Sequence, residues 1–465
     1  MNSLSPLVKD QTFEATVLSR LFSALSDAAI AYAVLRNYEH LPFRLDARDI
    51  DIVVVPEDLS RAVDVVARIA QQSGFRFANY YDDERMRQVA LFKRSEQGLF
   101  DLKIDFFTSS QVFGIQCMSA QEMLSGHRLH NGIPVVSGVV MVLDKLLFHL
   151  AVGKSLHPKY DVLFGEVAWN HRSELRAGLA DSVGGVAADD MMSAIMADRA
   201  SGIPILPASR RVQMLARMWR RRGTGASLLM ARFVAERVQN RWRPHGLLVS
   251  VSGPDGSGKT TVIDLVLAQL RQCYGADSVE YHHFRPTFLP RIAEVAKATG
   301  AVKAVDTDYG SPHRAQPSGF LGSITRLAYY ALDYALGYFR AVRPSLTNRK
   351  IVVFDRYYYD MICDPRRSRV RLPGWYLRMV GHLLPLPRFA FFIRVLPEVA
   401  YVRKQELTRE RISELNDAYG DLVRRGWMIE IDNNGPAERA AAEIVDHIVD
   451  HYDAAARRQL KVAAR

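Results

Sequence analysis

The feature that most constrains this chain is a glycine-rich segment between an apolar run and a helical pattern. The segment is Gly253-Pro-Asp-Gly-Ser-Gly-Lys-Thr260; it follows the apolar run Leu247–Ser252 and precedes an expected helix at Thr261–Gln272. Glycines let backbone N–H groups approach phosphate oxygens, and the N-terminus of the helix adds a favourable dipole. The order of strand, loop and helix therefore predicts a site that holds the phosphates of a nucleotide.

Two side chains of this segment have expected roles of their own. Lys259 can reach the β and γ phosphates, and the hydroxyl of Thr260 can ligate Mg²⁺. We therefore expect ATP and Mg²⁺ as cofactors. The residues expected to contact the ATP phosphates are Gly253, Asp255, Gly256, Ser257, Gly258, Lys259, Thr260 and Thr261.

The pattern of strands and helices divides the chain into three expected domains. Strands and helices alternate from Leu247 onwards, which predicts an α/β domain over 244–465 with a doubly wound parallel sheet covered on both faces. Residues 1–135 mix helical and extended patterns, which predicts an α+β domain. Residues 136–243 are almost wholly helical in pattern and form an expected connector. Within the last domain, 293–319 is rich in Gly, Ser, Pro and charge and is expected to be a mobile loop.

The last domain resembles the thymidylate kinase group of nucleoside monophosphate kinases over roughly 246–452. The matching pieces are the phosphate loop, the strand end Ile351-Val-Val-Phe-Asp-Arg-Tyr357 and the lid-like segment Val402–Arg411. A further match is the strand Met428–Ile431, which leads into Asp432-Asn-Asn-Gly-Pro436. The resemblance implies an ATP-dependent kinase.

The resemblance also implies roles for particular residues. Asp355 would help to position Mg²⁺, Arg356 would hold the phosphate of the acceptor, and Asp255 would lie near its sugar hydroxyl. Asp432, Asn433 and Asn434 would form the adenine loop. Some family members place a catalytic arginine where this chain has Gly256, so the transition-state charge is expected to meet lid arginines instead. The lid candidates are Arg403, Arg409 and Arg411, and the alternative for each is a solvated arginine paired with Glu406 or Glu410.

The chain departs from the family where the acceptor would bind. In place of the family's Arg-Glu-Pro-Gly-Gly pattern it has His283-Phe-Arg-Pro-Thr-Phe-Leu-Pro290, and arginines follow the Asp-Arg-Tyr segment. We therefore expect a small anionic acceptor other than dTMP. A different nucleoside monophosphate is the default, and a sugar or sugar phosphate of surface-polysaccharide metabolism is the rival. The expected acceptor contacts are Asp255, Arg285, Arg356, Arg366 and Arg367. The alternative is that the arginines after Tyr357 cap helices or pair with Asp360 and Asp364.

The first domain carries a second group of carboxylates. Asp49 and Asp51 alternate along one strand, and Asp101 and Asp105 alternate along another. This part resembles the polymerase-β-like nucleotidyltransferases, and the resemblance implies a metal site at Asp49, Asp51 and Asp105. Arg36-Asn37 stands where that family has a Gly-Ser pair. Three alternatives stay open: an active transferase, a degenerate relative that binds a nucleotide or sugar, and a chance cluster of surface acids.

The charge of the chain is concentrated in one segment. The chain carries 61 Lys and Arg against 50 Asp and Glu, a net charge of +11, and residues 209–243 hold ten arginines and one acid, Glu236. Such a segment is expected either to be a solvated helical connector or to contact an anionic membrane, nucleic acid or an acidic protein. The alternative to a kinase is therefore a regulatory ATPase docked on nucleic acid or on an anionic membrane. The sequence leaves the oligomeric state open, and a dimer is compatible with it.

Apolar runs and cysteines give the expected location. The longest apolar candidate for a membrane span, Pro134–Leu143, is ten residues long, and a span needs roughly 20. The cysteines Cys117, Cys273 and Cys363 are few and widely spaced, which does not indicate a disulfide framework. We expect a cytoplasmic protein without a transmembrane segment.

Overall fold

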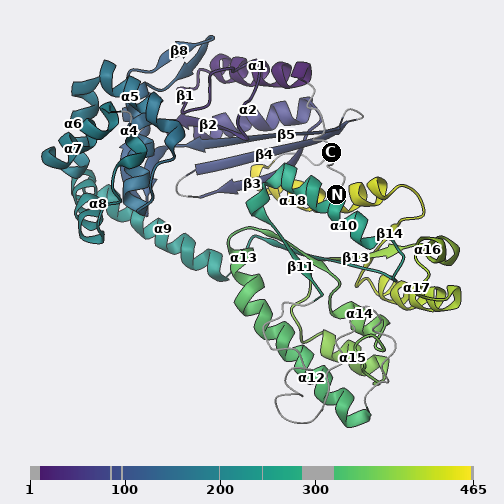
Figure 1. The fold of residues 1–465 in the computed structure, drawn as a ribbon. Helices are drawn as coiled ribbons and strands as arrows, with labels where there is room; N and C mark the ends of the chain where they lie inside the picture. The colour runs from purple at the N-terminus through teal and green to yellow at the C-terminus, as the bar shows by residue number, and fades with distance from the viewer. Residues whose placement is uncertain are drawn as a thin grey trace. The chain divides into compact units, whose positions relative to one another are not determined.

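The computed structural model describes residues 11–83, 86–95, 98–197, 199–242, 244–284 and 319–461 (Figure 1). It divides into two compact units. One consists of Met1–Gln239 together with Val449–Arg465, and the other of Asn240–Ile448. Arg285 and nearly all of the loop expected at 293–319 lie outside the described residues. No helix in the described ranges is long and apolar enough to span a bilayer.

The first unit is built on a mixed seven-stranded sheet in the order β3-β4-β5-β2-β1-β9-β8. Its strands are β1 (Tyr32–Val34), β2 (Asp49–Val54), β3 (Arg76–Asp82), β4 (Met86–Ser95), β5 (Gly98–Phe107), β8 (Arg128–His130) and β9 (Ile133–Val135). β2 pairs with β5 and β1 pairs with β9 in parallel, and the other neighbours are antiparallel. This arrangement is the mixture of helix and sheet that the alternating patterns predict.

Alternation along β2 and β5 sends the apolar side chains to one face of this sheet. Ile50, Ile52 and Val54 join a buried core with α1 (Gln11–Asp27) and α2 (Leu59–Gln72). The intervening residues of β2 therefore point to the opposite face. The C-terminal segment of the chain joins the same core, because Ala456 is buried in it and Asp453 accepts a hydrogen bond of 2.8 Å from the N–H of Phe77.

A second buried core in this unit is mainly helical. It packs against Ala33, Leu35 and Val53 of the sheet region and against the hairpin of β6 (Ser109–Val112) and β7 (Ile115–Ser119). Its helical elements are α3 (Ala120–Leu124), α4 (Gly138–Val152), η1 (Pro158–Tyr160), α5 (Asp161–Asn170), α6 (Arg172–Val183), α7 (Gly185–Met196), η2 (Ala200–Gly202), α8 (Ala208–Arg222) and α9 (Thr224–Trp242).

The second unit contains a parallel sheet of five strands in the order β11-β12-β10-β13-β14. The strands are β10 (Leu247–Ser252), β11 (Val279–His283), β12 (Ile351–Asp355), β13 (Phe389–Arg394) and β14 (Ile429–Asp432), and every neighbouring pair is parallel. All residues of β10 and β12 are buried, as expected for strands with both faces covered. The prediction of a parallel α/β sheet is confirmed.

Parallel pairing sets the place of the candidate site. β10 and β12 are neighbours with Val251 opposite Asp355, so the loop after β10 and the segment after β12 meet at one edge of the sheet. The helical elements of this unit are α10 (Lys259–Tyr274), η3 (Ala276–Ser278), α12 (Phe320–Gly337), η4 (Tyr338–Val342), α13 (Arg343–Thr347), α14 (Tyr358–Cys363), α15 (Gly374–Gly381), α16 (Pro397–Arg403), α17 (Arg409–Arg424) and the first part of α18 (Ala437–Leu460).

Candidate nucleotide-binding site

The glycine-rich loop follows β10 and ends where α10 begins, at Lys259. Gly258 caps the helix with φ of 77°, a left-handed conformation that favours glycine. A Cβ atom placed on Gly258 would lie 2.7 Å from Nδ2 of Asn433, so a larger residue would also collide with its neighbour. The loop therefore turns tightly and leads into the positive end of the helix dipole, where phosphate oxygens bind.

A cavity of about 450 Å³ lies against this loop, within the size range of small-ligand sites. It is lined by Pro254, Asp255, Gly256, Ser257, Gly258, Lys259, Thr260, Thr261, Arg403, Lys404, Asn433 and Ala437. All the residues predicted to contact the phosphates line it except Gly253. A Cβ atom on Gly253 would lie 2.9 Å from the carbonyl oxygen of Ile393, so this glycine permits close packing on β13 instead.

Lys259 and Asp355 are ion-paired at the meeting point of the two strand ends. Nδ1 of His283 lies 3.2 Å and the hydroxyl of Tyr281 lies 3.4 Å from the other carboxylate oxygen of Asp355. Burial opposes ionisation of Asp355, but His283 and the charge of Lys259 outweigh it and lower the pKa of this carboxyl. Burial, together with the charge of Asp355, raises the pKa of Tyr281 to about 12, so its hydroxyl stays protonated.

The residues expected to hold Mg²⁺ fit that ion by their chemistry. Asp355 offers an ionised carboxylate, and Thr260 offers a hydroxyl from the first turn of α10. Oxygen ligands of this kind, completed by phosphate oxygens and water, are the ones that Mg²⁺ prefers. Tyr281 and His283 were not singled out from the sequence. Their signal is their position near the end of β11, the strand that pairs with β12.

Arg356 follows Asp355 and is buried in a network of polar side chains. It adopts a φ of 72°, which is rare for a residue with a side chain and is found at functional sites. Its Nη1 atom lies 2.7 Å from Asp360, which also accepts a 2.7 Å hydrogen bond from the Tyr419 hydroxyl. Burial disfavours the charge of Arg356, but Asp360 and Asp255 outweigh it and raise the pKa of the guanidinium. The sequence suggests Asp360 only as an alternative partner of the arginines that follow Tyr357. In the structure Asp360 binds Arg356, which precedes Tyr357.

Asp255 is held by two arginines from the segment after β12. Nη2 of Arg356 and Nη1 of Arg367 each lie 2.7 Å from a different oxygen of its carboxylate. Burial opposes ionisation of Asp255, but the two guanidinium groups outweigh it and lower its pKa. The structure thus brings together three of the five predicted acceptor contacts. Arg366 is exposed to solvent, and Arg285 lies outside the described residues.

The three predicted lid arginines are placed differently from one another. Arg403 lines the cavity, and its Nη1 atom donates a 3.0 Å hydrogen bond to the carbonyl oxygen of Asn433. Arg411 instead pairs with Asp364 and Glu414, each at 2.8 Å. The guanidinium of Arg409 lies 5.2 Å from the ring centre of Tyr401. Of the three, only Arg403 reaches the cavity; beside it lies Lys404, which sequence reasoning missed although it is the next residue along the chain.

One residue of the predicted adenine loop touches the phosphate loop. Nδ2 of Asn433 donates a 2.6 Å hydrogen bond to the carbonyl oxygen of Ser257, and Asn433 lines the cavity. Oδ1 of Asn433 and the hydroxyl of Ser257 are buried and have no hydrogen-bond partner within the described part of the chain. Buried polar atoms normally have a partner, so these two atoms are available to a ligand. Asp432 is exposed, and Asn434 accepts a hydrogen bond from the N–H of Leu396.

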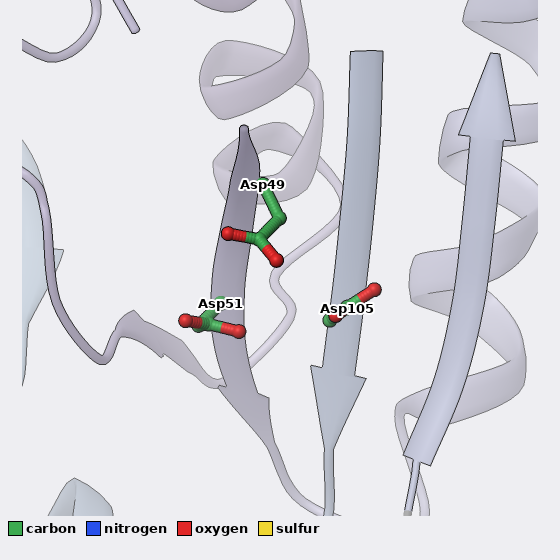
Figure 2. A group of neighbouring side chains, drawn as sticks. All are labelled: Asp49, Asp51 and Asp105. Atoms are coloured by element: carbon green, nitrogen blue, oxygen red, sulfur yellow. The ribbon is translucent and has the colours of Figure 1, made fainter. Parts of the chain in front are cut away.

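The first unit holds a separate group of carboxylates, shown in Figure 2. Asp49 and Asp51 lie on β2 and Asp105 on the neighbouring strand β5, with Asp51 directly opposite Asp105. One ligand atom from each of the three lies within 4.8 Å of the others. The structure thus groups the three acids that the sequence predicts as metal ligands. Asp101 is not a member of this group.

Two cations already pair with these carboxylates. Nζ of Lys103 lies 3.2 Å from both Asp49 and Asp105. Nε of Arg36 lies 2.6 Å from Asp51. Burial raises the pKa of Asp51 to about 6, although the charge of Arg36 opposes this shift. Lys103 was missed from the sequence, although strand alternation places it on the same face as Asp105.

Comparisons with known proteins give a structural likeness but no family. No family model matches the chain, and no curated protein matches it. Among solved structures, the thymidylate kinase from Ehrlichia chaffeensis is similar, with 18% sequence identity over 44% of this chain and 99% of that chain. The TM-score is 0.30, so the function is inferred below from the residues of the site.

Proposed function

We propose that the second unit transfers the γ-phosphoryl group of ATP to a small anionic acceptor in a Mg²⁺-dependent reaction. The observation that carries this proposal is the pairing of Lys259, at the start of α10, with Asp355, at the end of the neighbouring strand. Phosphoryl transfer depends on positioning and on cations around the moving group. The cavity beside the loop provides both, since it holds the loop backbone, Lys259 and Arg403.

Each group of the cavity has a role in this proposal. The loop backbone and the N-terminus of α10 bind the phosphates, and Lys259 holds the β and γ phosphates once it leaves Asp355. Thr260 and Asp355 would hold Mg²⁺, which when bound neutralises charge on the phosphates. Arg403 lines the cavity and is placed to meet charge that develops during transfer.

The acceptor is proposed to bind beside Asp255, Arg356 and Arg367. Their two guanidinium groups lie at the loop that holds the donor, and a guanidinium fork suits phosphate or carboxylate. We propose a nucleoside monophosphate other than dTMP as the acceptor, with a sugar phosphate as the rival within the same chemistry.

A screen of acceptors tests this proposal. The purified protein is incubated with Mg²⁺ and ATP and with single nucleoside monophosphates, dTMP among them, or single sugar phosphates. The molecular masses of the products are measured by mass spectrometry. A new product heavier than its acceptor by one phosphoryl group supports the kinase. ADP that forms at the same rate with every acceptor and with none, without a phosphorylated product, supports a regulatory ATPase instead.

A second candidate function belongs to the carboxylates Asp49, Asp51 and Asp105. Three acids whose ligand atoms lie within 4.8 Å form a donor set that fits a divalent cation, and such a set supports nucleotidyl transfer. Lys103 and Arg36 compete with a metal ion for the same oxygens. The alternative is therefore a degenerate nucleotidyltransferase-like domain that binds a nucleotide or sugar without catalysing a reaction.

Metal binding and activity separate these two alternatives. Mn²⁺ binding is followed by electron paramagnetic resonance in the wild type, in Asp105→Asn and in Asp101→Asn, which changes an acid of the same strand outside the group. Weaker Mn²⁺ binding in Asp105→Asn, together with wild-type binding in Asp101→Asn, supports a metal site. Pyrophosphate release from a nucleoside triphosphate in the wild type, lost in Asp105→Asn, then distinguishes a transferase from a binding relative.

A further inference from the structure

Helix α9 of the first unit carries apolar side chains on two of its sides. One side faces the β6–β7 hairpin, because a Cβ atom placed on Gly114 would lie 2.8 Å from Cβ of Phe233. Another side faces solvent, with Val234 52% and Val238 53% exposed. The helical period places Val234 and Val238 in one stripe along the helix. A helix that only connected two folded parts through water would carry polar residues on this side.

The exposed stripe is not the only apolar surface in this region. A groove of about 430 Å³ lies between α8 and α9 and is lined mainly by apolar residues, among them Val212, Leu215 and Trp219 of α8 and Met230 of α9. Val212 is 65% and Trp219 is 41% exposed. The α8–α9 apolar face consists of the exposed residues Val212, Trp219, Val234 and Val238 together with the groove.

Exposed arginines occupy other positions of the same two helices. Residues 209–239 contain eight arginines and one acid, Glu236. Two of the arginines are used inside the unit, since Arg221 pairs with Asp181 and Arg222 pairs with Glu122. Five others are exposed on the two helices: Arg210, Arg217, Arg220, Arg232 and Arg237.

We propose that the α8–α9 apolar face docks the protein on an anionic lipid surface. Helices that lie in a membrane interface combine apolar side chains, which enter the acyl boundary, with arginines, which contact anionic headgroups. Each arginine near such a surface adds to the attraction. The proposal does not depend on the phosphoryl transfer proposed for the other unit, and it assigns a use to exposed apolar residues that transfer does not need.

The arginines of α8 and α9 favour an anionic lipid surface over a second copy of the chain and over nucleic acid. A second copy of the chain placed on the same face would bring two sets of arginines together, which like-charge repulsion opposes. Nucleic acid would contact the arginines but would leave Val212, Val234 and Val238 without partners, because bases stack on aromatic rings and not on branched aliphatic side chains. An anionic bilayer satisfies the arginines and the aliphatic side chains together.

Vesicle flotation tests the proposal on the full-length protein. We expect the wild type to float with vesicles of phosphatidylcholine mixed with phosphatidylglycerol and to remain behind with phosphatidylcholine alone. Val234→Ser combined with Val238→Ser should weaken binding roughly tenfold or more, because each loses buried methyl groups. Arg232→Glu combined with Arg237→Glu should weaken it by roughly 25-fold or more, about fivefold for each arginine removed.

Matched controls show whether the position of the change matters. Val162→Ser with Val186→Ser changes two exposed valines of α5 and α7, and Arg68→Glu with Arg172→Glu changes two exposed arginines of α2 and α6. Neither control should alter flotation. Thermal unfolding like that of the wild type should confirm that all four variants fold, because every substituted side chain is exposed.

Four results would overturn the proposal. The first is absence of flotation by the wild type, and the second is equal flotation with phosphatidylcholine alone. The third is a dimer in sedimentation velocity that the two serine substitutions dissociate, which would assign the face to a second copy of the chain. The fourth is binding of a DNA fragment that the arginine variant loses while the serine variant floats like the wild type, which would assign the arginines to nucleic acid.

Discussion

Arg367 donates a 2.7 Å hydrogen bond to Asp255 and so joins the segment after α14 to the phosphate loop. Arg356 binds the other oxygen of the same carboxylate. Asp255 is therefore fixed between two guanidinium groups at the edge of the cavity. This arrangement defines where an anionic acceptor has charged groups to meet, next to the loop proposed to hold ATP.

Replacing Arg367 by alanine should weaken the use of the acceptor and leave ATP binding intact. A guanidinium contact to an anionic group contributes about 1.5–3 kcal/mol, which corresponds to a rise in the KM of the acceptor of about tenfold or more. Steady-state kinetics with varied acceptor and fixed ATP measure this change, and the Kd of ATP is measured separately by calorimetry.

Arg366→Ala is the matched control, since this neighbouring arginine is exposed. Its acceptor KM should stay within about twofold of the wild type, as expected for an exposed charge. Equal losses in the two variants would mean that Arg366 also contributes to acceptor binding, as the sequence alone predicts. An unchanged acceptor KM in both variants would show that Arg367 does not contribute to acceptor binding.

Asp360→Asn should destabilise the second unit. Asp360 is buried, and it binds Arg356 and the hydroxyl of Tyr419. Removing one partner of a buried ion pair leaves the other charge poorly compensated, at a cost of about 3 kcal/mol or more in the free energy of unfolding. Urea unfolding followed by hydrogen exchange at amides of β10 and β12 measures this loss.

Asp421→Asn serves as the comparison. Asp421 pairs with Arg425 in an exposed i, i+4 arrangement on α17, and such pairs contribute about 0.5 kcal/mol or less. If the two asparagine variants are equally stable, the Arg356 network does not hold this unit together.

The stability of the first unit should depend on pH through Asp51. Burial raises the pKa of Asp51 from 3.8 to about 6, so the folded state binds the proton more tightly than the unfolded chain. The contribution of this proton to stability is complete below pH 3.8 and is lost as pH rises to about 6. The loss amounts to at most about 3 kcal/mol.

Asp51→Asn should remove this part of the pH dependence, because asparagine does not titrate. Hydrogen exchange at amides of β2 and β5, measured between pH 4 and 7 without added metal, compares the variant with the wild type and with Asp64→Asn, an exposed acid on α2. A wild-type slope that persists in Asp51→Asn would show that Asp51 is not the titrating group.

Local patterns in the sequence predict much of this fold. The apolar run at 247–252 is β10, and the helix expected at Thr261–Gln272 lies within α10 (Lys259–Tyr274). The hairpin of β6 and β7 was missed, because Ser109–Val112 and Ile115–Ser119 mix small polar and apolar residues and are buried by tertiary packing. Strand order depends on pairings distant in sequence and could not be derived from local patterns.

The candidate site likewise contains residues that the sequence predicts and residues that only the tertiary structure brings together. The phosphate loop is a continuous segment, so its residues are recognisable from their spacing alone. The partners Asp360, His283 and Lys404 come from separate elements, and the pairing of β12 with β10 and with β11 brings the first two near the loop. The two arginines at 366 and 367 are indistinguishable in sequence, and the turn after α14 directs only Arg367 to Asp255.

The formation of ADP from ATP in Lys259→Ala, with and without the acceptor found by screening, tests the central claim most directly. Lys350→Ala is the matched control. Lys350 lies just before β12, at the opposite end of this strand from Asp355, and pairs with Glu280 of β11. We expect acceptor-stimulated turnover in the wild type and in Lys350→Ala, and a loss of about a thousandfold or more in Lys259→Ala, measured at a temperature at which thermal unfolding shows both variants to be folded. Turnover in Lys259→Ala equal to that of the wild type would contradict the assignment of phosphoryl transfer to this site.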